Sequence, residues 1–80
     1  MSYKETVIRK IYEAAAKTFG CDTSNFSPLT NFGKDFNAKS INIVQIIGVL
    51  EDEYEVEIDF MKFRNTSNIE EAAEYVAGLL

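Results

Sequence analysis

The sequence predicts an all-α fold, a small bundle of three long helices plus one short helix, with a long ordered loop between the first and second long helices. Two observations lead to this prediction. Three segments repeat their apolar residues at the spacing of an amphipathic helix, and the one alternating stretch, residues 55–58, is too short to make a sheet. With 80 residues, 46% of them hydrophobic, the chain is expected to form a single domain, residues 1–80.

The first helix is predicted over about residues 3–18, because apolar side chains recur there every three or four positions. Gly20 follows as its natural stop. The apolar positions of this helix are Val7, Ile8, Ile11, Tyr12, Ala15 and Phe19.

Residues 20–39 are rich in Gly, Ser, Thr, Asn and Pro, which is typical of a loop. Four apolar residues nevertheless recur in it every three or four positions. We therefore expect an ordered strap that packs onto the helices rather than a free loop. The four residues are Phe26, Leu29, Phe32 and Phe36.

The second helix is predicted from about Ser40 to Tyr54, and it has two distinct faces. One face is a complete apolar stripe within about 100° of arc, and the opposite face is apolar near Ser40 and acidic further along. The stripe consists of Ile43, Ile46, Ile47, Leu50 and Tyr54. The opposite face consists of Ile41, Gln45, Gly48 and Asp52, with Val44, Glu51 and Glu55 beside it.

Two further helices complete the bundle. Asp59 can cap one short turn over residues 59–64. The last helix is expected over about residues 68–79, where Ser67-Asn68-Ile69-Glu70 has the pattern of a capping box. Its apolar face consists of Ile69, Ala72, Ala73, Val76 and Leu80.

The composition excludes several classes of function. The chain has no histidine and one cysteine, Cys21, so it can form neither a Ser–His or Cys–His nucleophile pair nor an internal disulfide. Residues 51–59 are acidic but lack the glycine and the ligand spacing of a calcium loop. We expect neither a catalytic nor a metal site.

The charge distribution indicates the kind of partner. The net charge is −5, and residues 41–80 hold nine acidic and two basic side chains. A nucleic-acid-binding protein would have the opposite sign, so the acidic half is either a docking surface for a basic protein or a solvated face. No apolar run is long enough for a membrane span or a signal peptide, and we expect a cytoplasmic location.

The exposed aliphatic residues Ile41 and Val44 permit two interpretations: scattered surface residues, or a surface that a partner covers. Gly48 also permits two interpretations: a glycine that the helix merely tolerates, or a point where another molecule approaches the helix closely. Ser40 is either the cap of the helix or a modification site, where a phosphate ester would meet free backbone N–H groups at the positive end of the helix dipole.

The sequence around Ser40 resembles the acyl carrier proteins, four-helix domains that carry a 4′-phosphopantetheine arm on a serine. Phe36-Asn37-Ala38-Lys39-Ser40-Ile41 is similar to the serine turn of the family, and Val44 and Leu50-Glu51-Asp52-Glu53-Tyr54 are similar to the helix that follows. Residues 19–20, 32–36, 54–58 and 69–76 match the family pattern in the same order.

The resemblance implies that a holo-carrier-protein synthase, which is a phosphopantetheinyl transferase, attaches the arm from coenzyme A to Ser40. Acyl intermediates of fatty-acid, polyketide or related biosynthesis would then travel on the arm as thioesters. The chain would catalyse nothing itself, and an acidic monomer is the natural expectation. The alternative is an unmodified carrier-like interaction module in which Ser40 is only a helix cap.

The resemblance also assigns two groups of contact residues. Enzymes with basic docking patches, which load, transfer or condense the acyl group, would contact Lys39, Ile41, Val44, Gln45, Gly48, Glu51, Asp52 and Glu55. The acyl chain would be sheltered by Phe32, Phe36, Ile47, Leu50, Ile58 and Ala72, whose alternative role is packing in the core.

The chain departs from the family pattern at several positions near the serine. Lys39 stands in place of the usual Asp, which reverses the charge beside the attachment point, and Asn37 replaces a glycine. Asn42 and Gln45 replace acids, and Gly48 replaces a large apolar residue. These changes remove negative charge and apolar contact from the first half of the docking helix, so we infer a specialised carrier with its own enzymes.

Overall fold

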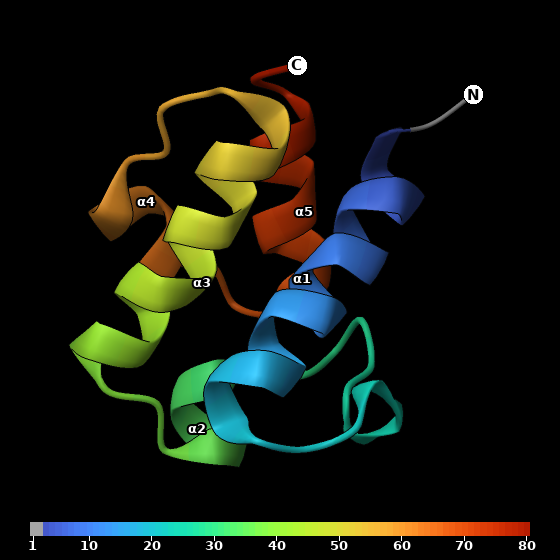
Figure 1. The fold of residues 1–80 in the computed structure, drawn as a ribbon, viewed down its shortest axis with the longest axis vertical. Helices are drawn as coiled ribbons and strands as arrows, with labels where there is room; N and C mark the ends of the chain where they lie inside the picture. The colour runs from blue at the N-terminus through green and yellow to red at the C-terminus, as the bar shows by residue number, and fades with distance from the viewer. Residues whose placement is uncertain (1–2) are drawn as a thin grey trace.

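The computed structural model describes residues 3–80 and confirms the predicted all-α bundle. Three long helices enclose the core, and residues 3–80 contain no strand (Figure 1). The long helices are α1 (Tyr3–Phe19), α3 (Ser40–Tyr54) and α5 (Ile69–Ala77). The shorter elements are a 3₁₀ turn η1 (Thr23–Asn25), α2 (Phe32–Phe36) and α4 (Phe60–Arg64).

The core is formed by the apolar stripes that the helical spacing predicts. Helix α1 packs against both α3 and α5, and Ile11, Ile46 and Leu50 are completely buried between the helices. Tyr54, predicted in the stripe of α3, is only half-buried. Tight packing of such side chains is the main stabilising contribution in a domain of this size.

Some helix ends lie where the sequence predicts them and others do not. Helix α1 stops before Gly20, whose φ of +68° is the left-handed conformation that ends a helix. The cap of α5 is Asn68 rather than the predicted Ser67, because the Asn68 side chain accepts a hydrogen bond from the backbone N–H of Glu71. Helix α5 ends at Ala77, and Leu80, predicted on its core face, is exposed.

The segment between α1 and α3 is ordered but is not simply a loop. It contains η1 and the helix α2, which the sequence analysis missed. Asn31 caps α2 by accepting from the N–H of Lys34, and Asp35 reaches back to the N–H of Asn31. Phe26 is buried as expected, whereas Leu29 is 74% exposed, so the prediction that it packs on the helices is wrong.

This segment is attached to the start of α5 by three hydrogen bonds. The N–H groups of Ile69 and Glu70 donate to the carbonyls of Thr30 (3.0 Å) and Pro28 (2.9 Å), and the Asn31 amide donates to the Ser67 carbonyl (2.8 Å). The first N–H groups of a helix have no partner within the helix. Here the distant segment supplies the acceptors, which fixes its position.

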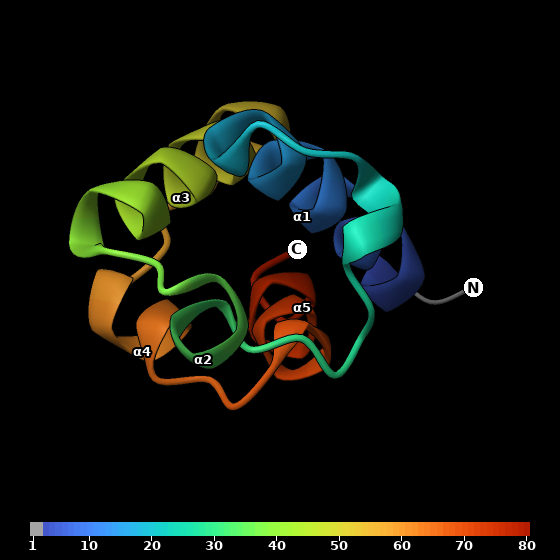
Figure 2. The same cartoon turned by 90° about the horizontal axis from the view of Figure 1, so that it is seen from below.

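An aromatic cluster holds α2 against the end of α1. Phe26 stacks on Phe36 with ring centroids 4.8 Å apart and meets the edge of Phe32, and Phe19 stacks on Phe36 at 5.1 Å. Tyr12 of α1 stacks on Phe26 from the other side. Such ring pairs add to the energy of burial, and Figure 2 shows α2 at the base of the bundle, directly before α3 begins.

The two residues before helix α4 are held by contacts from two long helices. Asp59 caps it as predicted, by accepting from the N–H of Lys62. The N–H of Asp59 donates to the Tyr75 hydroxyl of α5, and the N–H of Ile58 donates to the Glu51 carboxylate of α3, both at 2.9 Å. Phe63 is the buried side chain of α4.

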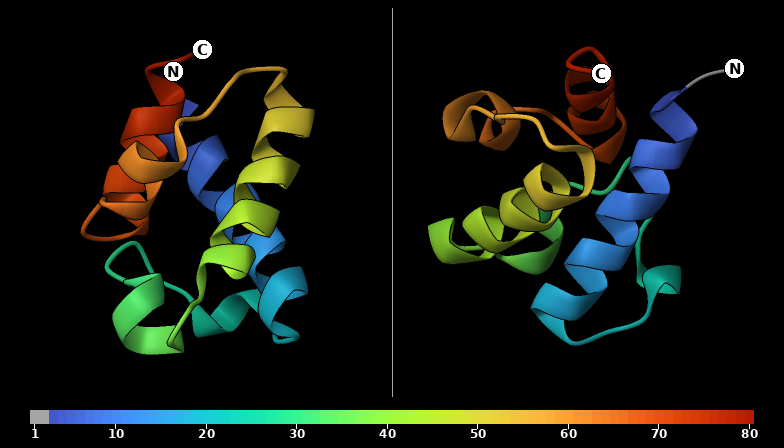
Figure 3. Two further views of the ribbon diagram at one scale, coloured as in Figure 1. Left: turned by 90° about the vertical axis from the view of Figure 1, so that its left-hand side faces the viewer. Right: turned by 45° about the horizontal axis from the view of Figure 1, so that its top comes forward.

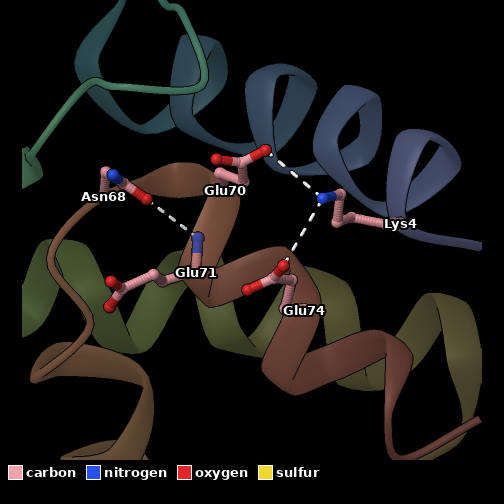
Figure 4. Close-up of polar contacts among 5 residues, drawn as sticks. All are labelled: Lys4, Asn68, Glu70, Glu71 and Glu74. Atoms are coloured by element: carbon pink, nitrogen blue, oxygen red, sulfur yellow. Dashed lines mark hydrogen bonds and ion pairs between the residues drawn. The ribbon is translucent and has the colours of Figure 1, made fainter.

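Lys4 joins the first turn of α1 to α5. Its ammonium lies 3.3 Å from the Glu70 carboxylate and 3.4 Å from that of Glu74 (Figure 4). The hydrogen bond with Glu70 and the charge of that carboxylate raise the pKa of Lys4 above 10.5. Across residues 3–80, no helix is both long enough and apolar enough to span a bilayer.

We predict that Lys4→Gln lowers the melting temperature at neutral pH and low salt, because the ion pairs are lost. The pKa of Lys4 is raised in the fold, so this stabilisation is fully present below 10.5 and is lost as the pH rises through the raised value. The difference in melting temperature between the wild type and the variant should shrink above pH 10.5 and in high salt.

Lys17→Gln is the control, because Lys17 is exposed on the same helix and takes part in no ion pair within residues 3–80. Both variants share the alkaline destabilisation from Tyr12 and Tyr54, whose pKa values are raised by burial. A melting difference that stayed constant from pH 7 to pH 11 would contradict the role of Lys4.

Candidate functional site

Ser40 is exposed and is the first residue of α3, not its cap. Of the two interpretations of Ser40, the structure does not show the cap: the capping position is Lys39, which has an extended backbone. A lysine ammonium cannot accept a hydrogen bond. The side-chain contact that holds this end comes instead from Asn42, whose Oδ1 accepts from the N–H of Lys39 at 2.8 Å.

This arrangement leaves the Ser40 hydroxyl without a structural role. Within residues 3–80 it makes no hydrogen bond, and the first turn is closed by the N–H groups of Asn42 and Ile43, which donate to the carbonyl of Lys39. A serine side chain at the start of a helix usually bonds to the backbone. An exposed hydroxyl with no partner is available for modification.

The turn before Ser40 depends on Asn37, which adopts the left-handed conformation with φ 51° and ψ 42°. Asn tolerates this conformation better than most residues. The following residue, Ala38, donates its N–H to the carbonyl of Phe32, which closes the end of α2. The aromatic cluster therefore fixes α2, and α2 fixes the direction from which the chain enters α3.

The electrostatic surroundings of Ser40 are positive. The first turn of α3 contains no acidic residue, and the positive end of the helix dipole lies there. The adjacent Lys39 forms no ion pair within residues 3–80, whereas Lys4 and Lys10 are paired with glutamates. A negatively charged ester on Ser40 would fit this environment, because it would meet the helix dipole and the ammonium group of the adjacent Lys39.

The outer face of α3 is as exposed as the helical spacing predicts. Ile41 and Val44 are 58% and 50% exposed, although they are large and aliphatic. The remaining exposed members of the predicted partner-binding group are Lys39, Gln45, Gly48, Asp52 and Glu55. These seven residues form a continuous surface that is apolar near Ser40 and acidic at the end of the helix, which we call the α3 outer face.

Glu51 differs from the rest of the predicted partner-binding group. It is half-buried, and its carboxylate accepts the hydrogen bond from Ile58 described above. Its neighbour Glu55 ends α3 with a φ of 53°, an unusual value for a residue other than glycine. Glu51 therefore holds the segment after α3 in place, and Asp52 and Glu55 carry the acidic surface.

A cavity of about 330 Å³ lies beside the start of α3. Its walls come from α2, the first turn of α3, α4 with residues 65, 66 and 68, and α5. The left view of Figure 3 shows how these four helices are arranged. Ala38 and Ile43, which bracket Ser40 in the sequence, both line it. Consecutive Cα atoms are about 3.8 Å apart, so Ala38 Cα lies within about 8 Å of Ser40 Cα.

The cavity includes two of the six residues predicted to shelter an acyl chain, Phe32 and Ala72. Phe36 belongs to the aromatic cluster. The other three, Ile47, Leu50 and Ile58, are buried in the core and do not line the cavity. That the six residues shelter an acyl chain remains a prediction. In the structure, the four that do not line the cavity pack within the fold.

Sequence reasoning missed the polar part of this cavity. Thr30, Asn31, Arg64, Asn65, Thr66 and Asn68 all line it. No local pattern marks these residues as neighbours, because the wall depends on contacts such as the one between Asn31 and Ser67, 36 positions apart. The described residues contain no group of three acidic, cysteine or histidine side chains that could hold a metal ion.

Comparison with known proteins gives a consistent result. The family model described as "Phosphopantetheine attachment site" matches residues 9–76. The chain is 33% identical over 73 residues to a protein of Rubrobacter xylanophilus named "Acyl carrier protein", a match that covers 91% of this chain and 90% of the relative. A protein of the same name from Lactobacillus acidophilus is 32% identical, with 91% of each chain covered. No solved structure matches the chain significantly.

We predict that Gly48→Ala raises the free energy of unfolding by about 0.5–1 kcal/mol, because alanine is the better helix former. A Cβ added at Gly48 would meet nothing within 4 Å, so no clash offsets the gain. Urea denaturation followed by circular dichroism measures the change. Gly20→Ala is the control of opposite sign, since alanine is strained at a φ of +68°. Destabilisation by Gly48→Ala would show that the α3 outer face is not open at this point.

Proposed function

This chain belongs to the phosphopantetheine-attachment family that includes the acyl carrier proteins, and on that premise we propose that Ser40 is the residue that bears the 4′-phosphopantetheine arm. The family consists of carriers, so the chain is a carrier and not a catalyst. The observation that carries the assignment is the Ser40 hydroxyl, which is exposed at the first position of α3 and makes no hydrogen bond within residues 3–80.

The residues around Ser40 fit a phosphodiester. The N–H groups of Ser40 and Ile41 donate to no backbone acceptor outside the helix within residues 3–80, and free N–H groups at a helix start bind phosphate oxygens. Lys39 would add an ammonium group from the exposed side. Once attached, the arm supplies a thiol that holds an acyl group as a thioester, and this chain supplies its position and recognition.

Attachment requires a partner enzyme, because the chain offers no base beside the serine. A phosphopantetheinyl transferase would remove the Ser40 proton while the serine oxygen bonds to the phosphorus of coenzyme A that carries the pantetheine. The bond from that phosphorus to the adenosine bisphosphate breaks at the same time. This reaction places the phosphodiester where the positive surroundings of Ser40 stabilise it.

We further propose that biosynthetic enzymes dock on the α3 outer face, and that they present a matching surface. Ile41 and Val44 would be covered by apolar side chains, and Asp52 and Glu55 would meet basic ones. Lys39 favours a partner that is neutral or acidic close to the serine. The pathway is fatty-acid, polyketide or related biosynthesis, and the departures at Lys39 and Gly48 support a specialised member.

We expect this carrier to work as a monomer in the cytoplasm. The only cysteine, Cys21, is unpaired and half-buried, and an arm that ends in a thiol stays functional only where thiols are kept reduced. In the alternative function, an unmodified interaction module, Ser40 would be only a helix cap; the capping position at Lys39 supports the carrier over this alternative.

The first test is the intact mass after incubation with coenzyme A and a phosphopantetheinyl transferase. We expect the mass to rise by one arm for the wild type and for Ser67→Ala, and not for Ser40→Ala. Ser67 is likewise an exposed serine near the start of a helix, so it is a matched control. Because Ser40 is not a cap, Ser40→Ala should change the unfolding free energy by less than about 0.5 kcal/mol. A wild-type protein that gained no mass would support the unmodified module.

The second test concerns docking. We predict that Asp52→Lys lowers kcat/KM for arm transfer by about fivefold at low salt, because an exposed charge at the rim of an interface has a small, salt-sensitive effect. Asp22→Lys makes the same charge change at an exposed position directly before η1, outside the α3 outer face, and should leave kcat/KM unchanged. Equal losses in the two variants would indicate a general charge effect and not a docking surface.

A further inference from the structure

The residues that line the cavity beside Ser40 fall into an apolar group, which we call the apolar wall, and a polar group, which we call the polar wall. The apolar wall consists of Phe32, Ala38, Ile43, Phe63 and Ala72. The polar wall is formed by residues 30–31 and by the continuous segment Arg64, Asn65 and Thr66, followed by Asn68. A shelter for a saturated alkyl chain needs no hydrogen-bonding groups, so the polar wall requires an explanation.

Half of the polar wall is used by the fold itself. Thr30 Oγ1 accepts from the N–H of Ser27, and Thr66 Oγ1 donates to the carbonyl of Phe63. Asn31 donates to Ser67 and accepts from Lys34. These three residues maintain the segments that enclose the cavity, and the side chain of each already makes a hydrogen bond within the fold.

The other half of the polar wall has hydrogen-bond donors that remain unused. Within residues 3–80, the guanidinium of Arg64 and the amide of Asn65 make no hydrogen bond or ion pair. Asn68 uses its side-chain oxygen to cap α5, while its Nδ2 donates to no group in the same residues. Arg64 and Asn65 are exposed and Asn68 is half-buried. Three side chains with N–H donors that have no partner within residues 3–80 therefore border one cavity, and one of them carries a positive charge.

A saturated chain would draw no benefit from these donors, and burying them against it would cost free energy, because each would lose water without gaining an acceptor. A carboxylate gains from the same groups. The guanidinium matches its two oxygens in geometry and charge, and a charge-assisted hydrogen bond is stronger than a neutral one. The apolar wall suits the methylene groups between the thioester and the carboxylate.

Resting on the proposed attachment at Ser40, we propose that the carrier's cargo is an acyl chain that ends in a carboxylate, with Arg64 and Asn65 as the residues that select it. The thioester end of the cargo stays near Ala38 and Ile43, on the side of the cavity that adjoins Ser40. The distal carboxylate lies against α4 and residues 64–65. A cavity of about 330 Å³ is at the lower end of the range for small-molecule pockets, which favours a short chain.

The test compares two cargoes of equal length. A phosphopantetheinyl transferase loads Ser40 from hexanoyl-coenzyme A or from adipoyl-coenzyme A, whose chain has six carbons and a distal carboxylate. The rate of thioester hydrolysis of each loaded protein is divided by that of the same acyl group on free pantetheine. We expect the adipoyl group to be protected about fivefold more than the hexanoyl group, the scale of one partly exposed ion pair.

The amide NMR shifts of residues 64, 65 and 68 should differ between the two loaded forms. Arg64→Gln should remove the difference in protection, while Arg64→Lys should keep part of it, because lysine retains the charge but not the planar fork. Arg9→Gln removes the same side chain from an exposed position on α1 and should leave the difference unchanged.

The possible failures can be distinguished. If neither cargo adds mass to the protein, attachment at Ser40 is wrong and this proposal is wrong with it. If both cargoes add mass but hexanoyl is protected as well as adipoyl, or if Arg64→Gln leaves the difference unchanged, the choice of cargo is overturned and attachment at Ser40 stands.

Discussion

The attachment of residues 28–31 to the start of α5 determines the shape of the site. Helix α5 begins with N–H groups that need acceptors, and the carbonyls of Pro28 and Thr30 supply them. These bonds and the aromatic cluster together hold the segment between α1 and α3, in which Phe26 and Thr30 are the buried residues. Thr30, Asn31 and Asn68 therefore meet in one wall of the cavity, and α2 is held below it.

The position of the start of α3 depends on this arrangement. The aromatic cluster secures α2 on the end of α1, and the left-handed turn at Asn37 then redirects the chain toward Ser40. Asn42 closes the turn from within α3, which leaves the serine hydroxyl outside the hydrogen-bond network. Ser40 is thus left available for modification because the side chain of Asn42, and not that of Ser40, makes the hydrogen bond at this helix end.

The long helices could be predicted because each buries a stripe that repeats with the helical period, and because Gly20 and Asp59 mark ends that depend on single residues. The outward position of Ile41 and Val44 followed from the same periodicity. Ends with two competing caps could not be decided in this way. Ser40 and Ser67 are both good capping residues, but Lys39 and Asn68 hold those positions. The Asn42 side chain accepts from the N–H of Lys39 at one helix, and the Asn68 side chain accepts from the N–H of Glu71 at the other.

Helix α2 and the cavity lie beyond what the sequence pattern could reveal. Helix α2 has only five residues, fewer than two turns, so it has no periodicity to detect; the one available signal was Asn31 followed by Phe32 and Phe36 at a spacing of four. The cavity brings together segments more than 30 positions apart. Its polar lining depends on contacts such as the hydrogen bond between Asn31 and Ser67, 36 positions apart.

The anchoring of α4 gives the cavity one wall that is easier to displace than the others. Helix α4 contributes Phe63 to the buried core and is tied to the bundle through Asp59 and Ile58, whereas α1, α3 and α5 share the remaining apolar contacts. Regions with few buried contacts open at lower free-energy cost than the rest of a fold. Helix α4 is therefore a wall of the cavity that we expect to yield at a lower free-energy cost than α3 or α5 if the size of the cavity changes.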